Sequence, residues 1–277
     1  MSLIVVSGLH RSGTSLIMQL IKEGGIDCIV DELEFEKKER MLKMQKFYNE
    51  STYLADGLTW KGIEKFEKNV CKEKPQCIKL FIQTLQTSLP SIFKQFNSII
   101  IMVRNWRNQE RSNRLLYEDN TKIMFKECED EVVKYKVLSE GGIDKYIKNR
   151  RYPLGVKWGF YYTYFLLHIR FPQDNIKIIT FENLLNNTDE IVDDLIQFGM
   201  NINKKTIVTN ADKKQSKFSV IKHDDTEEFE KEFYKFLDLL YEKYANGTYY
   251  DTEFMNSVEY WYNKMCSQVS KVPAYDF

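Results

Sequence analysis

Residues that bind metals are scarce in this chain. Among 277 residues there are three histidines and five cysteines, and the cysteines form no CxxC pair and have no histidine at ligand spacing. We therefore expect reduced thiols and no metal site. An excess of one charge is also missing, since forty basic and forty acidic residues cancel. The composition thus gives no reason to expect nucleic acid or an anionic membrane as a partner.

Long hydrophobic runs are absent as well. The most apolar stretch, WGFYYTYFLLHIRF at residues 158–171, is shorter than the roughly 20 residues that cross a bilayer, and it carries His168 and Arg170. We interpret it as a buried helix and expect no membrane span. A strand pattern begins at Leu3, which leaves no room for a signal peptide, so we expect a cytoplasmic protein.

The chain also lacks repeats, low-complexity tracts and linkers rich in proline or glycine, which predicts a single domain over residues 1–277. Short β-branched runs alternate with helical patterns, and this alternation is typical of a doubly wound α/β fold. The clearest run, SIIIMV at 98–103, is continuously apolar, as in parallel strands that are buried on both faces. Further strands are predicted at residues 3–7, 76–81 and 175–181.

Two amphipathic helices are predicted near the C-terminus, at residues 226–245 and 252–268. By contrast, residues 119–150 are highly charged and show no clean period. We interpret them as a helical excursion or a mobile insertion and assign them no chemistry.

The most informative stretch is VVSGLHRSGTSLI at residues 5–17, where a strand pattern leads through a glycine-bearing turn into a helix pattern. It comes close to the P-loop GxxxxGK[ST], in which amides at a helix N-terminus hold phosphates and a lysine reaches the outer phosphates. Here Thr14 stands at the lysine position, and the cation is Arg11, three residues earlier. The loop keeps a backbone suited to a tetrahedral oxyanion, but the missing lysine argues against ATP.

The segment HRSGTSLI after a hydrophobic strand resembles the phosphosulfate-binding loop of the sulfotransferases, in which a cation precedes Ser-Gly-Thr-[ST]. This resemblance implies a three-layer, P-loop-like α/β fold with a central parallel sheet flanked by helices and with extra C-terminal helices. It also implies that the 5′-phosphosulfate of 3′-phosphoadenosine 5′-phosphosulfate (PAPS) is held by Arg11, Ser12, Gly13, Thr14 and Ser15. An arginine beside a row of amides can stabilise the charge that develops on the bridging oxygen during sulfuryl transfer.

A second motif, IIIMVRNWRNQERSN, is similar to the element with which the same family binds the 3′-phosphate. Arg104 follows a strand and Ser112 lies eight residues later, so the resemblance assigns both to that phosphate. Trp106 and Asn108 stand where the family often has Pro and Asp, and the match is therefore partial. A third stretch, IKIITFENLL, looks like the late strand and helix of the family, with Phe181 in place of the usual tyrosine.

Sulfuryl transfer is helped by a general base that removes the proton of the acceptor. The family uses a histidine or a carboxylate, and no histidine stands between the loop and the second motif, where its cytosolic members have one. Relatives that use a carboxylate place a glutamate soon after the first helix, which makes Glu32 our candidate, with Asp31, Glu34 and the loop residue His10 as alternatives.

We therefore expect a metal-independent sulfotransferase that moves a sulfuryl group from PAPS to a hydroxyl or amine, leaving adenosine 3′,5′-bisphosphate (PAP). The acceptor is expected to be a small molecule or a carbohydrate, and its identity and the oligomeric state are not given by the sequence. Two alternatives stay open: a P-loop kinase that uses ATP and magnesium, and a catalytically silent relative that binds nucleotide.

Overall fold

The computed structural model describes residues 3–29, 75–87, 96–127, 131–149, 155–169, 171–207 and 228–269. The chain forms two compact units. The first comprises Met1–Asn105, His168–Phe218 and Tyr241–Thr248. The second comprises Trp106–Leu167, Ser219–Leu240 and Tyr249–Phe277. The single domain expected over the whole chain stays a prediction.

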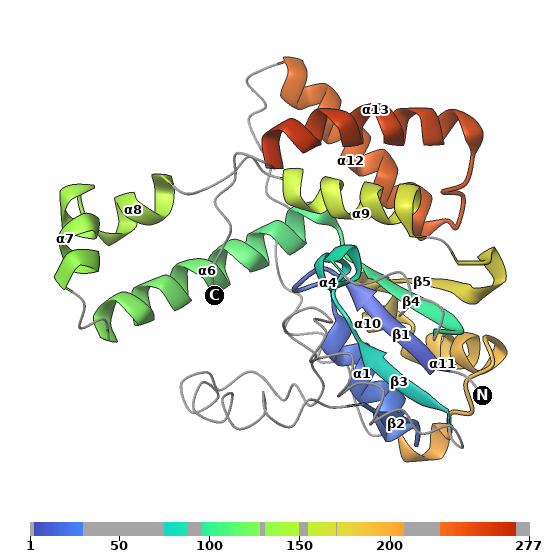
Figure 1. Ribbon diagram of the computed structural model, residues 1–277. Coiled ribbons are helices and arrows are strands. Elements are labelled where there is room, and N and C mark those ends of the chain that lie inside the picture. Colours follow the sequence, from blue (N-terminus) through green and yellow to red (C-terminus); the bar gives the residue numbers. More distant parts are fainter. Residues whose placement is uncertain are drawn as a thin grey trace. The chain divides into compact units, whose positions relative to one another are not determined.

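The first unit is built on a parallel sheet, whose strands are drawn as arrows in Figure 1. In the described ranges it has five strands in the order β2-β3-β1-β4-β5, and every neighbouring pair is parallel. These strands are β1 (Leu3–Gly8), β2 (Asp27–Cys28), β3 (Gln76–Lys79), β4 (Ser98–Val103) and β5 (Ile176–Thr180). Parallel pairing brings the carboxyl ends of β3, β1, β4 and β5 to one edge of the sheet. The predicted α/β fold with a central parallel sheet is confirmed.

Helices connect and flank these strands. In the first unit they are α1 (Thr14–Glu23), α4 (Ile82–Thr87), α10 (Phe181–Asn186) and α11 (Thr188–Gln197). Helix α10 begins at once after β5 because the side chain of Thr180 accepts a hydrogen bond from the Asn183 amide at 3.2 Å, which caps the first turn. The chain therefore turns directly from the sheet edge into a helix, and Phe181 and Glu182 lie at that edge.

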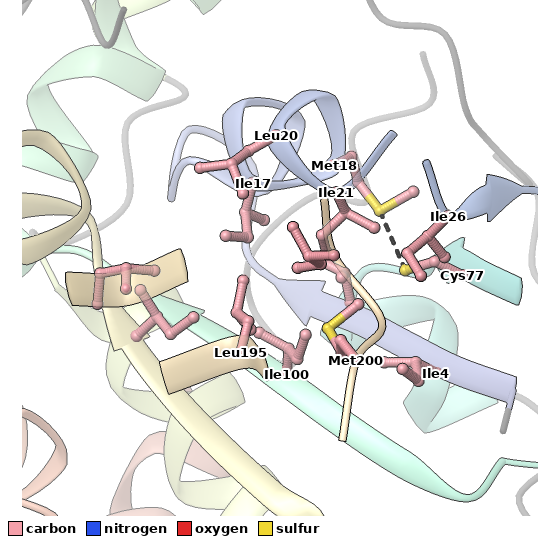
Figure 2. Close-up of a cluster of buried hydrophobic side chains, with 14 of the residues drawn as sticks. Ile4, Ile17, Met18, Leu20, Ile21, Ile26, Cys77, Ile100, Leu195 and Met200 are labelled. Carbon is pink, nitrogen blue, oxygen red and sulfur yellow. Dashed lines mark hydrogen bonds between the residues drawn. The ribbon is translucent and has the colours of Figure 1, made fainter. Parts of the chain in front are cut away.

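One face of the sheet carries a core that α1 and α11 cover, and Figure 2 shows its side chains. Helix α1 contributes Ile17, Met18, Leu20 and Ile21, α11 contributes Ile191, Val192 and Leu195, and the strands contribute Ile4, Val6, Cys77, Ile100, Met102 and Ile179. Side chains alternate along a strand, so Val5 and Ile101 point to the opposite face, and both are fully buried. The sheet is thus covered on both faces, as the continuous apolar run at 98–103 predicts.

Two left-handed residues shape the turn between β1 and α1. Arg11 has φ of 67°, a value that non-glycine residues rarely adopt, and Gly13 has φ of 97°. A Cβ on Gly13 would lie 2.5 Å from Cδ2 of Phe181. The aromatic ring at the start of α10 therefore packs directly against the turn and leaves room only for glycine.

The second unit is helical. Its residues form α6 (Trp106–Glu127), α7 (Glu131–Ser139), α8 (Ile143–Asn149) and most of α9 (Val156–His168), α12 (Glu228–Ala245) and α13 (Thr252–Val269). The two predicted C-terminal helices are present, and the described part of the charged stretch 119–150 is largely helical. Within the described ranges, no helix is both long enough and apolar enough to cross a bilayer.

Residues 158–168 of the aromatic stretch lie in α9, most of whose residues are buried as predicted. The indole of Trp158 donates a hydrogen bond to Oε1 of Gln109 on α6 at 3.1 Å. Gly159 permits close packing, because a Cβ there would lie 2.7 Å from Leu237 on α12 and 2.8 Å from Met265 on α13. The helices of this unit therefore pack through α9.

A buried carboxyl group lies in the same helical core. Glu110 on α6 is 1% exposed. Burial raises the pKa of the Glu110 carboxyl to about 7, while the charges of Arg114 and Lys157 and a backbone hydrogen bond from Trp158 act in the opposite direction. Burial also lowers the pKa of Lys157, and the charge of Glu110 partly offsets this.

We expect Gly13→Ala to destabilise the protein more than Gly25→Ala. Gly25 has a similar φ of 90°, so both substitutions carry the same backbone strain, but among the described residues no atom lies within 4 Å of a Cβ at Gly25. The contact with Phe181 should add roughly 1–3 kcal/mol at Gly13. Urea unfolding of both variants measures the difference. If both lost the same free energy of unfolding, the Phe181 ring would have moved aside without destabilising the protein.

Glu110→Gln should flatten the pH dependence of stability. A carboxyl whose folded pKa is raised contributes less to the free energy of unfolding as the pH rises, here between the ordinary value of 4.5 and about 7. We expect the wild-type free energy of unfolding to lose about 1–3 kcal/mol across this window relative to the variant. Urea unfolding at a series of pH values tests this, with Glu259→Gln at an exposed position of α13 as control. Parallel profiles for wild type and Glu110→Gln would contradict it.

Candidate active site

The N-terminus of α1 has the features of an anion site. No side chain caps it within the described structure, and its first turn, which begins at Thr14, contains no acidic residue. Its leading amides and the positive end of the helix dipole therefore face the turn that contains Arg11. The hydroxyl of Ser12 is buried and has no hydrogen-bond partner among the described residues. A tetrahedral anion would satisfy amides and hydroxyl together.

Arg104 lies beside this turn, directly after β4. The residue is 6% exposed, and its Nη1 donates a hydrogen bond to the backbone carbonyl of Arg11 at 3.1 Å. The guanidinium carbon lies 4.4 Å from the centroid of the Phe181 ring. Burial lowers the pKa of Arg104, the charge of Glu182 opposes that shift, and Arg11 adds to it. The structure thus brings the ends of β1, β4 and β5 together around one guanidinium group.

Glu182 supports this arrangement from α10. Its Oε1 accepts a hydrogen bond from the backbone amide of Asn105 at 3.2 Å, and its Oε2 accepts one from the hydroxyl of Tyr241 at 2.9 Å. Burial raises the pKa of Tyr241, and the charge and the hydrogen bond of Glu182 raise it further. The Tyr241 hydroxyl therefore keeps its proton and acts as a donor, which holds the carboxylate close to the residue that follows Arg104.

Lys79 is the part of the site that sequence analysis missed. It is the last residue of β3, which pairs with β1, and it is 3% exposed. Its ammonium nitrogen donates a hydrogen bond to Oγ of Ser15 at 3.0 Å. Thr14 stands where a P-loop has its lysine, and Lys79 on the neighbouring strand supplies a positive charge at this turn instead. The signal was a single charged residue between Ile78 and Leu80 in the strand predicted at 76–81.

His10 comes directly before Arg11 in the turn, and its side chain is exposed. The imidazole contacts the ring of Phe81 with 3.8 Å between centroids and 32° between ring planes. Phe81 follows β3 by two residues and is 6% exposed, and the ammonium of Lys79 lies 5.1 Å from the same ring centroid. Phe81 therefore contacts both the loop histidine and the lysine at the end of β3.

The structure brings together part of the predicted site. Within the first unit, the turn residues Arg11 to Ser15 meet Arg104 and Lys79. Ser112 lies on α6 in the second unit and is 4% exposed, and its role beside Arg104 stays a prediction. Glu32, the candidate base, and its alternatives Asp31 and Glu34 fall outside the described residues.

The described side chains form no metal-like cluster. In those ranges, no group of three or more His, Cys, Asp or Glu side chains comes together in a way that could hold a metal ion. Arg11, Lys79 and Arg104 bring positive charge to the turn, and Glu182 brings one carboxylate near Arg104. The excess of positive charge favours an anionic ligand.

A mouse sulfotransferase, SULT7A1, complexed with PAP, shares 12% identity, with a TM-score of 0.39 over 99% of this chain and 86% of that one. Retinol dehydratase in complex with androsterone and the inactive cofactor PAP also shares 12% identity, with a TM-score of 0.39 over 99% of this chain and 82% of that one. Similarity at this level carries no argument here.

The sequence comparison is decisive. No curated protein matches the chain. A family profile described as the sulfotransferase domain, however, matches residues 2–242, which include the turn at α1, Lys79, Arg104 and Glu182. The chain belongs to the sulfotransferase domain family.

Proposed function

We propose that this protein transfers a sulfuryl group from PAPS to a hydroxyl or amine of a small-molecule or carbohydrate acceptor and leaves PAP. One observation carries the proposal. Two cationic side chains, Lys79 at the end of β3 and Arg104 after β4, contact the turn at the uncapped N-terminus of α1, and the turn itself contains Arg11. Such a site fits an anionic donor, and PAPS carries anionic groups at both ends of its ribose.

The 5′-phosphosulfate end would lie on the turn itself. The amides of Gly13, Thr14 and Ser15, together with the buried Ser12 hydroxyl, supply donors, and Arg11 supplies charge. The Ser12 amide itself donates to the Leu9 carbonyl at 3.2 Å and so closes the turn. Lys79 is held at Ser15 Oγ, where its ammonium can stabilise the negative charge that develops on the bridging oxygen as the S–O bond breaks. These residues would therefore stabilise the leaving group, PAP.

The 3′-phosphate would be bound by Arg104, with the hydroxyl of Ser112 as the predicted second donor. The fork of a guanidinium matches the oxygens of a phosphate. The carbonyl of Arg11 and the ring of Phe181 fix the plane of the guanidinium before any ligand arrives. Preorganisation of this kind lowers the entropic cost of binding.

We assign no metal to the reaction. In P-loop ATPases, a lysine and a magnesium ion offset the charge of the phosphates. Here Lys79, Arg11 and Arg104 supply positive charge from protein side chains. The kinase alternative predicts instead that ATP binds tightly only with magnesium, and the calorimetry described next includes that arm.

Arg104→Gln should weaken the binding of PAP by about 10–100-fold, because a charge-assisted contact to a phosphate is lost. The binding of 5′-AMP, which lacks the 3′-phosphate, should change little. Calorimetry in the absence of metal measures both ligands, with ATP plus magnesium as a third. Equal losses for PAP and 5′-AMP would mean that Arg104 acts on the turn through the Arg11 carbonyl. Preference for ATP with magnesium would refute the proposed donor.

Lys79→Met tests the opposite end of the donor. The substitution keeps the apolar stem of the side chain and removes the ammonium at Ser15. We expect about 10-fold or greater weakening for PAP and little change for 3′-AMP, which lacks the 5′-phosphate. Lys22→Met, at an exposed position in the last turn of α1, removes the same charge and serves as the control. If the control weakened PAP binding equally, the effect of Lys79 would come from net charge alone.

A further inference from the structure

Transfer to a hydroxyl requires a proton acceptor, and the described part of the site offers few. Arg11, Lys79 and Arg104 carry positive charge and have no lone pair that can take a proton. The carboxylate of Glu182 already accepts hydrogen bonds from Asn105 and Tyr241. The imidazole of His10 is chemically suited to the task, since a neutral ring carries a basic nitrogen near neutral pH.

The position of His10 fits the path of an acceptor. The residue comes directly before Arg11 in the turn, and the contact with Phe81 at 3.8 Å fixes its ring. His10 is exposed whereas Phe81 is buried, so the imidazole forms the solvent side of this pair. An acceptor that arrives from solvent therefore meets His10 beside the turn that would hold the phosphosulfate.

We propose that His10 is the general base of sulfuryl transfer, an inference that rests on the proposed function. The hydroxyl oxygen of the acceptor forms a bond to sulfur, and at the same time a neutral ring nitrogen of His10 takes up the proton of that hydroxyl. The bond from sulfur to the bridging oxygen breaks, and PAP leaves with that electron pair. The imidazolium then returns its proton to water. Phe81 contacts the imidazole, the ammonium of Lys79 lies 5.1 Å from the centroid of the same Phe81 ring, and Arg11 is the next residue in the turn.

A purely structural role for His10 makes a different prediction. If the ring only packs on Phe81, then His10→Phe preserves the contact and should preserve function. If His10 is the base, the same variant keeps the packing and loses the proton acceptor. His168→Phe, at the exposed end of α9, is the matched control.

The first test needs no turnover. The chain has three histidines, so a spectrum of His10→Phe assigns the ring resonances of His10 in the wild type. We expect added PAP to shift the His10 resonances and leave those of His168 unchanged. If PAP binds in calorimetry and the His10 resonances do not move, this inference fails and the proposed function stands. If PAP does not bind at all, the proposed function fails and the base assignment fails with it.

The second test measures the release of PAP from PAPS with water as the acceptor. General-base assistance is worth about 10²–10⁴-fold, so we expect His10→Phe to lose at least about 100-fold in kcat with PAP affinity within a few-fold of wild type. We expect the wild-type rate to fall at low pH, where a base is protonated, and the remaining rate of His10→Phe to lack that fall; added imidazole should restore His10→Ala. If kcat of His10→Phe equalled that of the wild type, or if kcat fell only in proportion to a loss of PAP affinity, the assignment would be overturned.

Discussion

The site depends on one constraint, which is that four neighbouring parallel strands end at the same edge of the sheet. Strand β1 lies inside the sheet, so its carboxyl end is flanked by β3 on one side and β4 on the other. The turn to α1 can therefore receive a cation from each neighbour, and it does, in the form of Lys79 and Arg104. A turn at an edge strand would have had only one such neighbour.

Bringing cations together costs stability, and the structure offsets that cost with neutral acceptors more than with anions. Lys79 donates to a hydroxyl and Arg104 donates to a carbonyl. Glu182 adds a carboxylate near Arg104, but its two oxygens also accept hydrogen bonds from Asn105 and Tyr241. The positive potential at the turn is therefore only partly compensated within the described residues. A dianionic ligand would complete the compensation, which stabilises the complex over the empty protein.

Sequence patterns could predict the fold and the turn because both are local. The β-branched run at 98–103 and the glycines at 8 and 13 carry their own conformational preferences. Lys79 could not be found this way, since it lies 64 residues from Ser15 and the pair exists only through the register of β3 on β1. The contact between His10 and Phe81 depends on the same register. What the sequence missed was the pairing between segments, and the pairing assembles the site.

The contact between His10 and Phe81 joins the turn after β1 to the segment after β3. The end of β3 and the turn after β1 are neighbours at the sheet edge, so a ring attached to either segment can reach the same region. Here the segment that follows β3 carries the apolar ring and the turn carries the imidazole. The turn that would bind the donor then also carries the group that would activate the acceptor, which couples the two functions within six residues, from His10 to Ser15.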